Sequence, residues 1–157
     1  MQTRGNIEIR AFSHPACGAD SGRVNRAIVE LRTYIVEDNA TIRENLIGTL
    51  EELASIKAMG WAETEGDAKA WLDQRPAGWD LAIVDLFLKQ GSGLGVLEAC
   101  RSRDAGQRVV VLSNYATADM RKRCVQLGAD AVFDKSNEID ALVDYCIELC
   151  GAPGPSA

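Results

Sequence analysis

Histidine is almost missing from this sequence of 157 residues, in which His14 is the only one. A metal centre or catalytic site built on histidine is therefore not expected. The sequence also lacks a C-x-x-C pair, and an odd number of cysteines does not suit a full set of disulfides. We interpret the cysteines as reduced thiols, most of them in apolar helical positions. They are Cys17, Cys100, Cys124, Cys146 and Cys150.

Long apolar runs and an excess of basic residues are lacking too. No apolar stretch approaches the ~18 residues that a membrane span needs, and no apolar signal-peptide region follows Met1. The net charge of −6 gives no support to binding of nucleic acids or anionic membranes. We therefore expect a soluble, cytoplasmic protein with no nucleic-acid partner and no membrane contact.

Residues 27–150 carry the regular patterns, whereas the two ends do not. Residues 1–26 show no sustained period, so we expect a loose N-terminal extension, although residues 6–12 (NIEIRAF) alternate and could pair as an edge strand. Residues 151–157 (GAPGPSA) cannot continue a helix and are expected to form a disordered tail. The length between these ends predicts a single domain with a real core.

Apolar, strand-like runs alternate with helical patterns inside this domain. Each run is followed by apolar residues spaced three and four apart, as on one face of a helix. Thr117 is suited to cap the fourth helix, and Gly128 to follow its end. Five strand–helix units predict an α/β fold with a doubly wound, five-stranded parallel sheet. The runs lie at residues 31–36, 55–61, 81–84, 109–112 and 131–133.

The residues that end these runs carry the chemistry. In doubly wound sheets the binding site lies outside the carboxyl ends of the strands. The first run ends in Glu37 and Asp38, and the third ends in Asp85. The fourth ends in Ser113 and the fifth in Lys135. With the strand order 2-1-3-4-5, three acids, a hydroxyl and an ammonium group gather on one rim of the sheet.

Such a set of groups suits a cation and a phosphoryl group. Crowded carboxylates raise one another's pKa unless a cation lies among them, and oxygen ligands favour Mg²⁺. A lysine and a hydroxyl opposite the metal suit the oxygens of a phosphoryl group. Taken singly, Asp38 could instead cap a helix, and Asp85 could start a turn. Likewise, Lys135 could be a solvated loop residue and Ser113 a helix-entry hydroxyl.

Four segments, in this order and at this spacing, resemble the response-regulator receiver domain of two-component signalling. The resemblance covers roughly residues 31–150. It implies the flavodoxin-like (βα)5 fold with strand order 2-1-3-4-5. The segments are YIVEDNATIRENL (residues 34–46), LAIVDLFLKQGSGLGVLEA (81–99), VVVLSNYA (109–116) and GADAVFDKS (128–136).

The resemblance also implies a role for each acid. Asp85 would be the phosphoacceptor, phosphorylated by a histidine kinase or a phosphotransfer protein. Asp38, Asp85 and the backbone carbonyl of Phe87 would bind Mg²⁺, with Glu37 supporting the site from behind. The protein would then be a signalling module, and not an enzyme beyond its own phosphoryl transfer and dephosphorylation.

Ser113 and Lys135 are implied to contact the phosphoryl group, but their neighbours depart from the family pattern. Val132 stands where an aromatic switch residue is frequent, and Phe133 is only its neighbour. The resemblance therefore does not imply the usual aromatic rotamer mechanism for this chain. Ser136 follows Lys135 where proline is common, so we expect a strained Lys135–Ser136 bond that could be cis, at a cost of ~3 kcal/mol.

Nothing after Cys150 can form a DNA-binding helix-turn-helix, so we expect output through protein contacts. The basic run Arg121-Lys122-Arg123 on the fourth helix is our candidate surface for the downstream protein, although such a run is often only solvated. A homodimer is a further option. The alternative is that the sequence is a receiver fragment of a longer transcription factor or hybrid kinase.

Two enzymatic or nucleotide-binding interpretations fit the sequence less well. An aspartyl-nucleophile phosphatase would need a second acid two residues after Asp85, where Phe87 stands. The stretch GSGLG (residues 91–95) resembles a nucleotide loop, but Val96 denies it the G-x-G-x-x-G spacing. We interpret GSGLG as a turn between a strand and a helix.

Overall fold

Five parallel strands form one sheet in the order β2-β1-β3-β4-β5, as the sequence predicts. The structure is a computed structural model that describes residues 29–151. The strands are β1 (Leu31–Val36), β2 (Ile56–Ala62), β3 (Leu81–Val84), β4 (Arg108–Ser113) and β5 (Ala131–Asp134). The helices are α2 (Ala40–Leu53), α3 (Glu65–Gln74), α4 (Gly93–Ala99), α5 (Ala118–Gln126) and α6 (Ile139–Gly151).

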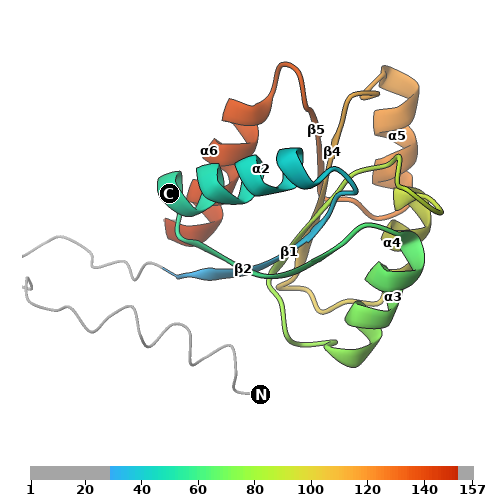
Figure 1. The fold of residues 1–157 in the computed structure, drawn as a ribbon, viewed down its shortest axis with the longest axis horizontal. Coiled ribbons are helices and arrows are strands. Elements are labelled where there is room, and N and C mark those ends of the chain that lie inside the picture. The colour runs from blue at the N-terminus through green and yellow to red at the C-terminus, as the bar shows by residue number, and fades with distance from the viewer. Residues whose placement is uncertain (1–28, 152–157) are drawn as a thin grey trace, which may run out of the picture.

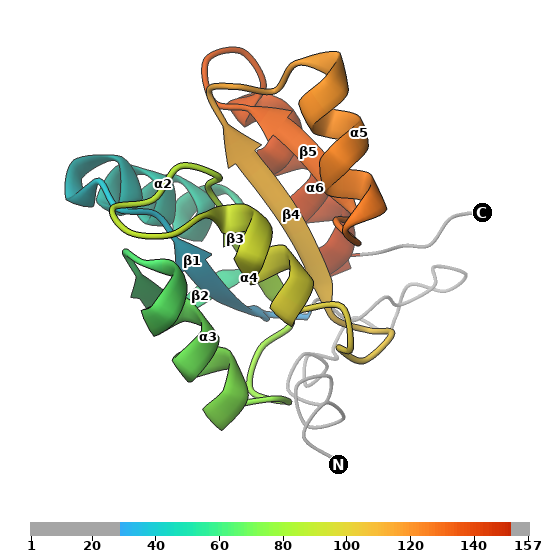
Figure 2. The same ribbon diagram turned by 90° about the vertical axis from the view of Figure 1, so that its right-hand side faces the viewer.

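Helices cover both faces of the sheet (Figures 1 and 2). Helices α2 and α6 pack on one face, and α3, α4 and α5 pack on the other. Each face has its own apolar core, because the strand side chains alternate between the two layers. The doubly wound prediction is therefore confirmed, and no strand end differs from the predicted one by more than one residue.

Polar side chains cap the N-termini of four helices, and so fix the residue at which each preceding loop ends. The side chains of Asn39, Thr64, Ser92 and Thr117 each accept a backbone N–H of the first turn that follows. Such caps satisfy amide groups that have no partner inside the helix. Gly128 follows α5 with a φ of +106°, a conformation that favours glycine. The predicted cap and stop of this helix are confirmed.

Four cysteines are buried and free: Cys100, Cys124, Cys146 and Cys150. The prediction of reduced thiols is confirmed for these four, and Cys17 lies outside the described residues. The predicted loose extension, with its option of an edge strand, also lies outside them, as does the predicted tail beyond Gly151. Among the described residues, no helix is long and apolar enough to cross a membrane.

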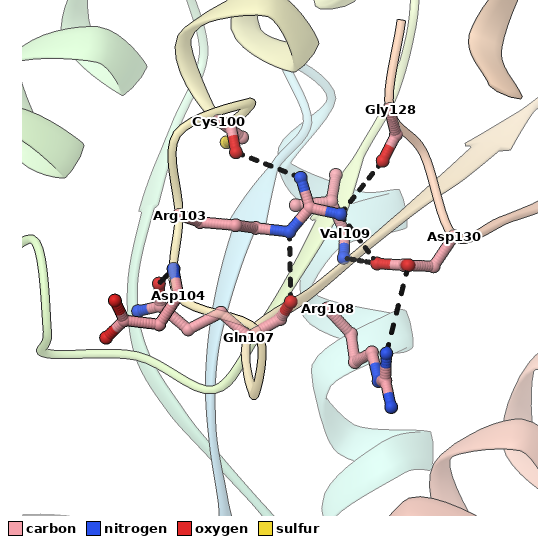
Figure 3. A network of polar contacts seen from close by, with 8 residues as sticks. All are labelled: Cys100, Arg103, Asp104, Gln107, Arg108, Val109, Gly128 and Asp130. Atoms are coloured by element: carbon pink, nitrogen blue, oxygen red, sulfur yellow. Dashed lines mark hydrogen bonds and ion pairs between the residues drawn. The ribbon is translucent and has the colours of Figure 1, made fainter. Parts of the chain in front are cut away.

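A polar network joins the loops that precede β4 and β5, at the end of the sheet opposite to the acids. Figure 3 shows the residues of this network. Arg103 donates hydrogen bonds to the carbonyl oxygens of Cys100 at 2.9 Å, Gln107 at 2.9 Å and Gly128 at 2.8 Å. It also donates to the carboxylate of Asp130 at 2.8 Å. One guanidinium thus fastens the loop before β4 to the turn before β5. The role of Arg103 that these contacts indicate is structural.

Candidate functional site

Three carboxylates meet at the carboxyl edge of the sheet, as predicted. Glu37 and Asp38 follow β1, and Asp85 follows β3, the strand paired with β1. One carboxylate oxygen from each of the three lies within 4.8 Å of the others. Glu37 and Asp85 are buried, at 3% and 7% exposure, whereas Asp38 is half-buried. This acidic cluster of oxygen donors can hold a divalent cation.

Lys135 lies between two of these acids. Its Nζ is 2.7 Å from Oε1 of Glu37 and 3.1 Å from Oδ2 of Asp85. Its backbone N–H donates to the carbonyl oxygen of Ser113 at 3.0 Å, which fixes the start of the β5–α6 loop. One ammonium group neutralises only one of the three carboxylates. The acidic cluster therefore retains an excess of negative charge that favours a further cation.

Burial and charge shift the pKa values in this cluster. Burial raises the pKa of Asp85, the charge of Lys135 opposes this shift, and the charge of Glu37 adds to it. Burial by itself would lower the pKa of Lys135, but the hydrogen bond to Glu37 and the charge of Asp85 outweigh it, so this pKa is raised. Lys135 is therefore stabilised as a cation, whereas burial destabilises the ionised form of Asp85.

The two oxygens of Glu37 are already engaged within the protein. Oε1 contacts Lys135, and Oε2 accepts the backbone N–H of Asn39 at 3.1 Å. Asp38 is more exposed and faces the same cluster, and its carboxylate makes no hydrogen bond or ion pair with the described residues. Of the two acids after β1, Asp38 is therefore the one better placed to bind a cation directly.

Ser113 lies fully buried at the end of β4, between the strand ends that carry Asp85 and Lys135. In the β4–β5 register it pairs with Asp134, the residue before Lys135. Its Oγ accepts the backbone N–H of Tyr115 at 3.0 Å. The hydroxyl oxygen thus holds the first residues of the β4–α5 loop in this arrangement.

Two aromatic side chains stand at the loops beside the acidic cluster. Phe87 is two residues after Asp85, and Tyr115 is two residues after Ser113. They are 53% and 57% exposed, and their rings meet edge to face with centroids 4.6 Å apart. The two loops that flank the site therefore touch through an aromatic pair whose side chains carry no carboxylate or amide.

The glycine-rich stretch at residues 91–95 is a turn and a helix start, as interpreted from its spacing. Gly91 has a φ of +83°, and Ser92 caps α4. The backbone N–H of Ser92 donates to the carboxylate of Glu65 at 2.9 Å. Phe87 and Ser92 form an antiparallel bridge, so the loop after Asp85 folds back on itself. These contacts fix the backbone of the loop that follows Asp85.

Arg43 is a buried polar residue near the site that the sequence interpretation missed. Its Nη1 donates to the carbonyl oxygen of Glu37 at 2.8 Å and lies 3.3 Å from Glu63, whose other oxygen is 2.7 Å from Lys89. Its guanidinium also lies 3.8 Å from the ring centroid of Trp61. The sequence did carry a signal for the burial of Arg43. It lies three residues before Leu46, on the apolar face of the helix, where arginine is unusual.

The departures from the family pattern near Lys135 have different outcomes. Val132 is half-buried against the core beneath α3, α4 and α5, whereas Phe133 packs in the opposite core with its ring 5.7 Å from that of Tyr145. Phe133 therefore does not replace the missing aromatic. The expectation of a cis Lys135–Ser136 bond is wrong, because no peptide bond between described residues is cis. Without proline, a peptide bond prefers trans by about 3 kcal/mol.

The basic run on α5 is not uniform. Lys122 and Arg123 are exposed, as a partner surface requires. Arg121 instead makes three internal contacts, with Ala116, Val132 and Glu138.

Comparison with known proteins gives similar sequences among bacterial regulators. The chain is 32% identical over 117 residues to the acid tolerance regulatory protein ActR of Rhizobium meliloti, which covers 74% of the chain and 58% of that protein. It is 30% identical over 108 residues to the photosynthetic apparatus regulatory protein RegA of Cereibacter sphaeroides, covering 67% of the chain and 56% of that protein. The match thus spans little more than half the length of these curated relatives.

Solved structures share the fold at low sequence identity. The signal receiver domain of the putative response regulator NarL from Mycobacterium tuberculosis superposes with a TM-score of 0.63 at 21% identity, covering 74% of the chain and 96% of that domain. A chain of the CheX–CheY–BeF3–Mg²⁺ complex from Borrelia burgdorferi has a TM-score of 0.66 at 17% identity, covering 75% of this chain and 87% of that chain. The family model of the response regulator receiver domain matches residues 33–146. The chain therefore belongs to the response regulator receiver domain family.

Proposed function

We propose that Asp85 accepts a phosphoryl group from a histidine kinase or a phosphotransfer protein, and that this switches a contact with another protein. The observation that carries the proposal is the Asp85 carboxylate, buried beside Glu37 and Asp38 with Lys135 at 3.1 Å. Membership of the receiver family and the names of the relatives as regulatory proteins support a signalling module.

In the transfer, a carboxylate oxygen of Asp85 attacks the phosphorus of a phosphohistidine. The new O–P bond forms as the N–P bond breaks, and the histidine nitrogen keeps the electron pair. Lys135 holds Asp85 and can contact the phosphoryl oxygens, on which charge develops. The donor set fits Mg²⁺, which Asp38, Asp85 and the Phe87 carbonyl would bind. When bound, this ion supplies positive charge to the phosphoryl oxygens.

Ser113 links the phosphoryl group to the rest of the molecule in this proposal. Its hydroxyl would donate to a phosphoryl oxygen, and in turning it would release the N–H of Tyr115 that it now accepts. The β4–α5 loop then shifts between two arrangements, each favoured by one state of Asp85. The exposed Lys122 and Arg123 of α5 are candidates for contact with the downstream protein.

The second candidate is that this chain acts as the receiver part of a longer regulator. It is favoured by the length of ActR and RegA, of which the matched regions make up 58% and 56%. In that case the switched contact would be with another domain of the same regulator. The phosphorylation chemistry is the same in both candidates.

Incubation with acetyl phosphate and Mg²⁺, followed by intact-mass measurement, tests the assignment of Asp85. We expect one phosphoryl group on the wild type and none on Asp85→Asn. A matched control is Asp119→Asn, an exposed acid in the first turn of α5, which should be modified like the wild type. Equal modification of Asp85→Asn and the wild type would overturn the proposal.

A further inference from the structure

Arg121 joins three segments of the chain through one guanidinium group. Its Nε donates to the carbonyl oxygen of Ala116 in the β4–α5 loop at 2.9 Å. Its Nη1 donates to the carbonyl oxygen of Val132 in β5 at 3.0 Å. Its Nη2 lies 2.9 Å from Oε1 of Glu138, just before α6. The planar fork holds these three acceptors in a fixed mutual arrangement, which a flexible ammonium group could not do.

The Glu138 end of this network leads back to the acidic cluster. Oε1 of Glu138 also accepts the backbone N–H of Asp134 at 2.8 Å, so one oxygen serves both Arg121 and the end of β5. The backbone N–H of Glu138 in turn donates to the carbonyl oxygen of Asp134 at 2.8 Å. Asp134 immediately precedes Lys135, which contacts Asp85. A change in the contact between Arg121 and Glu138 would therefore alter the hydrogen bonds of Asp134, the residue before Lys135.

The Ala116 end of the network lies in the segment that Ser113 controls. Ser113 Oγ now accepts the N–H of Tyr115, and Ala116 is the next residue. When the hydroxyl turns to another acceptor, this N–H loses its partner and the backbone of the segment rearranges. The carbonyl oxygen that Arg121 binds belongs to the same short segment. Movement of the loop is thus transmitted directly to the guanidinium.

We propose that Arg121 is a positioning residue that couples the loop after Ser113 to the end of β5 and the start of α6. The inference rests on the proposed phosphorylation of Asp85. The side chain of Val132 is aliphatic and cannot form a hydrogen bond with the β4–α5 loop. In this proposal β5 is instead coupled to the loop through the backbone carbonyl of Val132, which accepts from Arg121. Loss of the Ala116 contact removes one of the three contacts that fix the guanidinium, so the fork reorients and its hold on Glu138 weakens.

The test uses beryllium fluoride with Mg²⁺ as a phosphoryl analogue and reads amide hydrogen exchange. In the wild type, we expect the analogue to speed exchange at the amides of Tyr115 and Asp134 by about fivefold or more, the effect of losing one net hydrogen bond. In Arg121→Gln, the Tyr115 amide should still respond, but the Asp134 amide should not. Fluorine NMR of the bound analogue establishes that the site is filled in each sample.

Matched variants separate coupling from general loss of structure. Asp119→Asn removes an exposed charge from the same helix and should behave like the wild type. Glu138→Gln keeps an oxygen for the Asp134 amide but loses the ion pair, so the response at Asp134 should fall. It serves as the test, together with Arg121→Lys, if circular dichroism shows that Arg121→Gln is unfolded.

Each outcome has a separate meaning. A wild type in which the Asp134 amide does not respond, or an Arg121 or Glu138 variant in which it responds as in the wild type, would overturn the coupling role. If the wild type does not bind the analogue at all, the proposed function itself fails. Binding with a response confined to Tyr115 in the variants supports the inference.

Discussion

Replacement of Gly93 by alanine should damage both the stability and the chemistry of this protein. Gly93 is the first residue of α4, and its N–H donates to the carbonyl oxygen of Leu86 at 2.9 Å. A Cβ added to it would overlap the carbonyl oxygen of Asp85 and lie 2.8 Å from Cα of Leu86. Carbon atoms in ordinary contact are about 3.5–4.0 Å apart. Because both obstacles are backbone atoms, no side chain can swing away to make room.

The helix or the loop must therefore move by about 1 Å, the shortfall from an ordinary contact. Overpacking of this kind costs about 1–3 kcal/mol, and two backbone clashes place Gly93→Ala near the upper value. For a chain of this size, each kcal/mol lowers the melting temperature by about 2–4 °C, so we expect a decrease of about 10 °C. Since the loop carries Asp85, a 1 Å displacement should also slow its phosphorylation about 10²-fold.

Gly48 provides a matched control in the same protein. It is an exposed residue inside α2, and a Cβ there would meet nothing within 4 Å. Gly48→Ala should raise the free energy of unfolding by about 0.5–1 kcal/mol, because alanine is the better helix former. It should leave phosphorylation unchanged.

Thermal melts followed by circular dichroism and phosphorylation rates from intact mass measure both effects. A melting temperature of Gly93→Ala equal to that of the wild type would refute the packing argument. A destabilised variant that is phosphorylated at the wild-type rate would instead refute the claim that this glycine positions Asp85. Loss of stability in Gly48→Ala would show that helix propensity does not decide the outcome at that position.

Three further predictions concern the metal, the lifetime of the phosphoryl group and the thiols. Asp38→Ala should lose most of the rise in melting temperature that Mg²⁺ gives the wild type, and Glu37→Ala should lose less, because both oxygens of Glu37 are already engaged; an undiminished response in Asp38→Ala contradicts this. Phosphorylated wild type should decay slowly after donor removal, because Phe87 and Tyr115 obstruct the in-line water, and a Phe87→Asn/Tyr115→Glu double variant should decay up to about 10²-fold faster; an unchanged decay shows that the pair does not control water access. Burial raises the pKa of Cys146 to about 12, so only about one thiol in 10⁴ is ionised at pH 8, and iodoacetamide should label it only after unfolding; rapid labelling of the folded protein, located by peptide mass, would show that this helix opens.

The strands and the acidic cluster could be predicted because their signals are local. An apolar run followed by a 3.6-residue period identifies a strand–helix unit without knowledge of its neighbours. The carboxyl ends of parallel strands share one edge, so Glu37, Asp85 and Lys135 could be brought together on paper. To predict that these side chains lie together, only the strand order was needed in addition. The resemblance to receivers gave that order, and the structure has it.

The contacts of Arg43 and Arg121 could not be predicted in the same way. Most of their acceptors are backbone carbonyl oxygens, such as those of Glu37, Ala116 and Val132. Every residue has such an oxygen, so the sequence carries no mark of the one that is used. A run of three basic residues therefore looked uniform, although Arg121 differs from the other two by its contacts with Ala116, Val132 and Glu138.

By itself, the sequence determined the five strand–helix units, the order of the polar groups along the chain and the chemistry that these groups can perform. Only the tertiary structure decided which charges are engaged and where the backbone comes too close for a side chain, as at Gly93. The physical reason is range. Periodicity and capping act over a few neighbouring residues, whereas hydrogen-bond partners and steric clearance depend on segments that meet only after the sheet and its helices have packed.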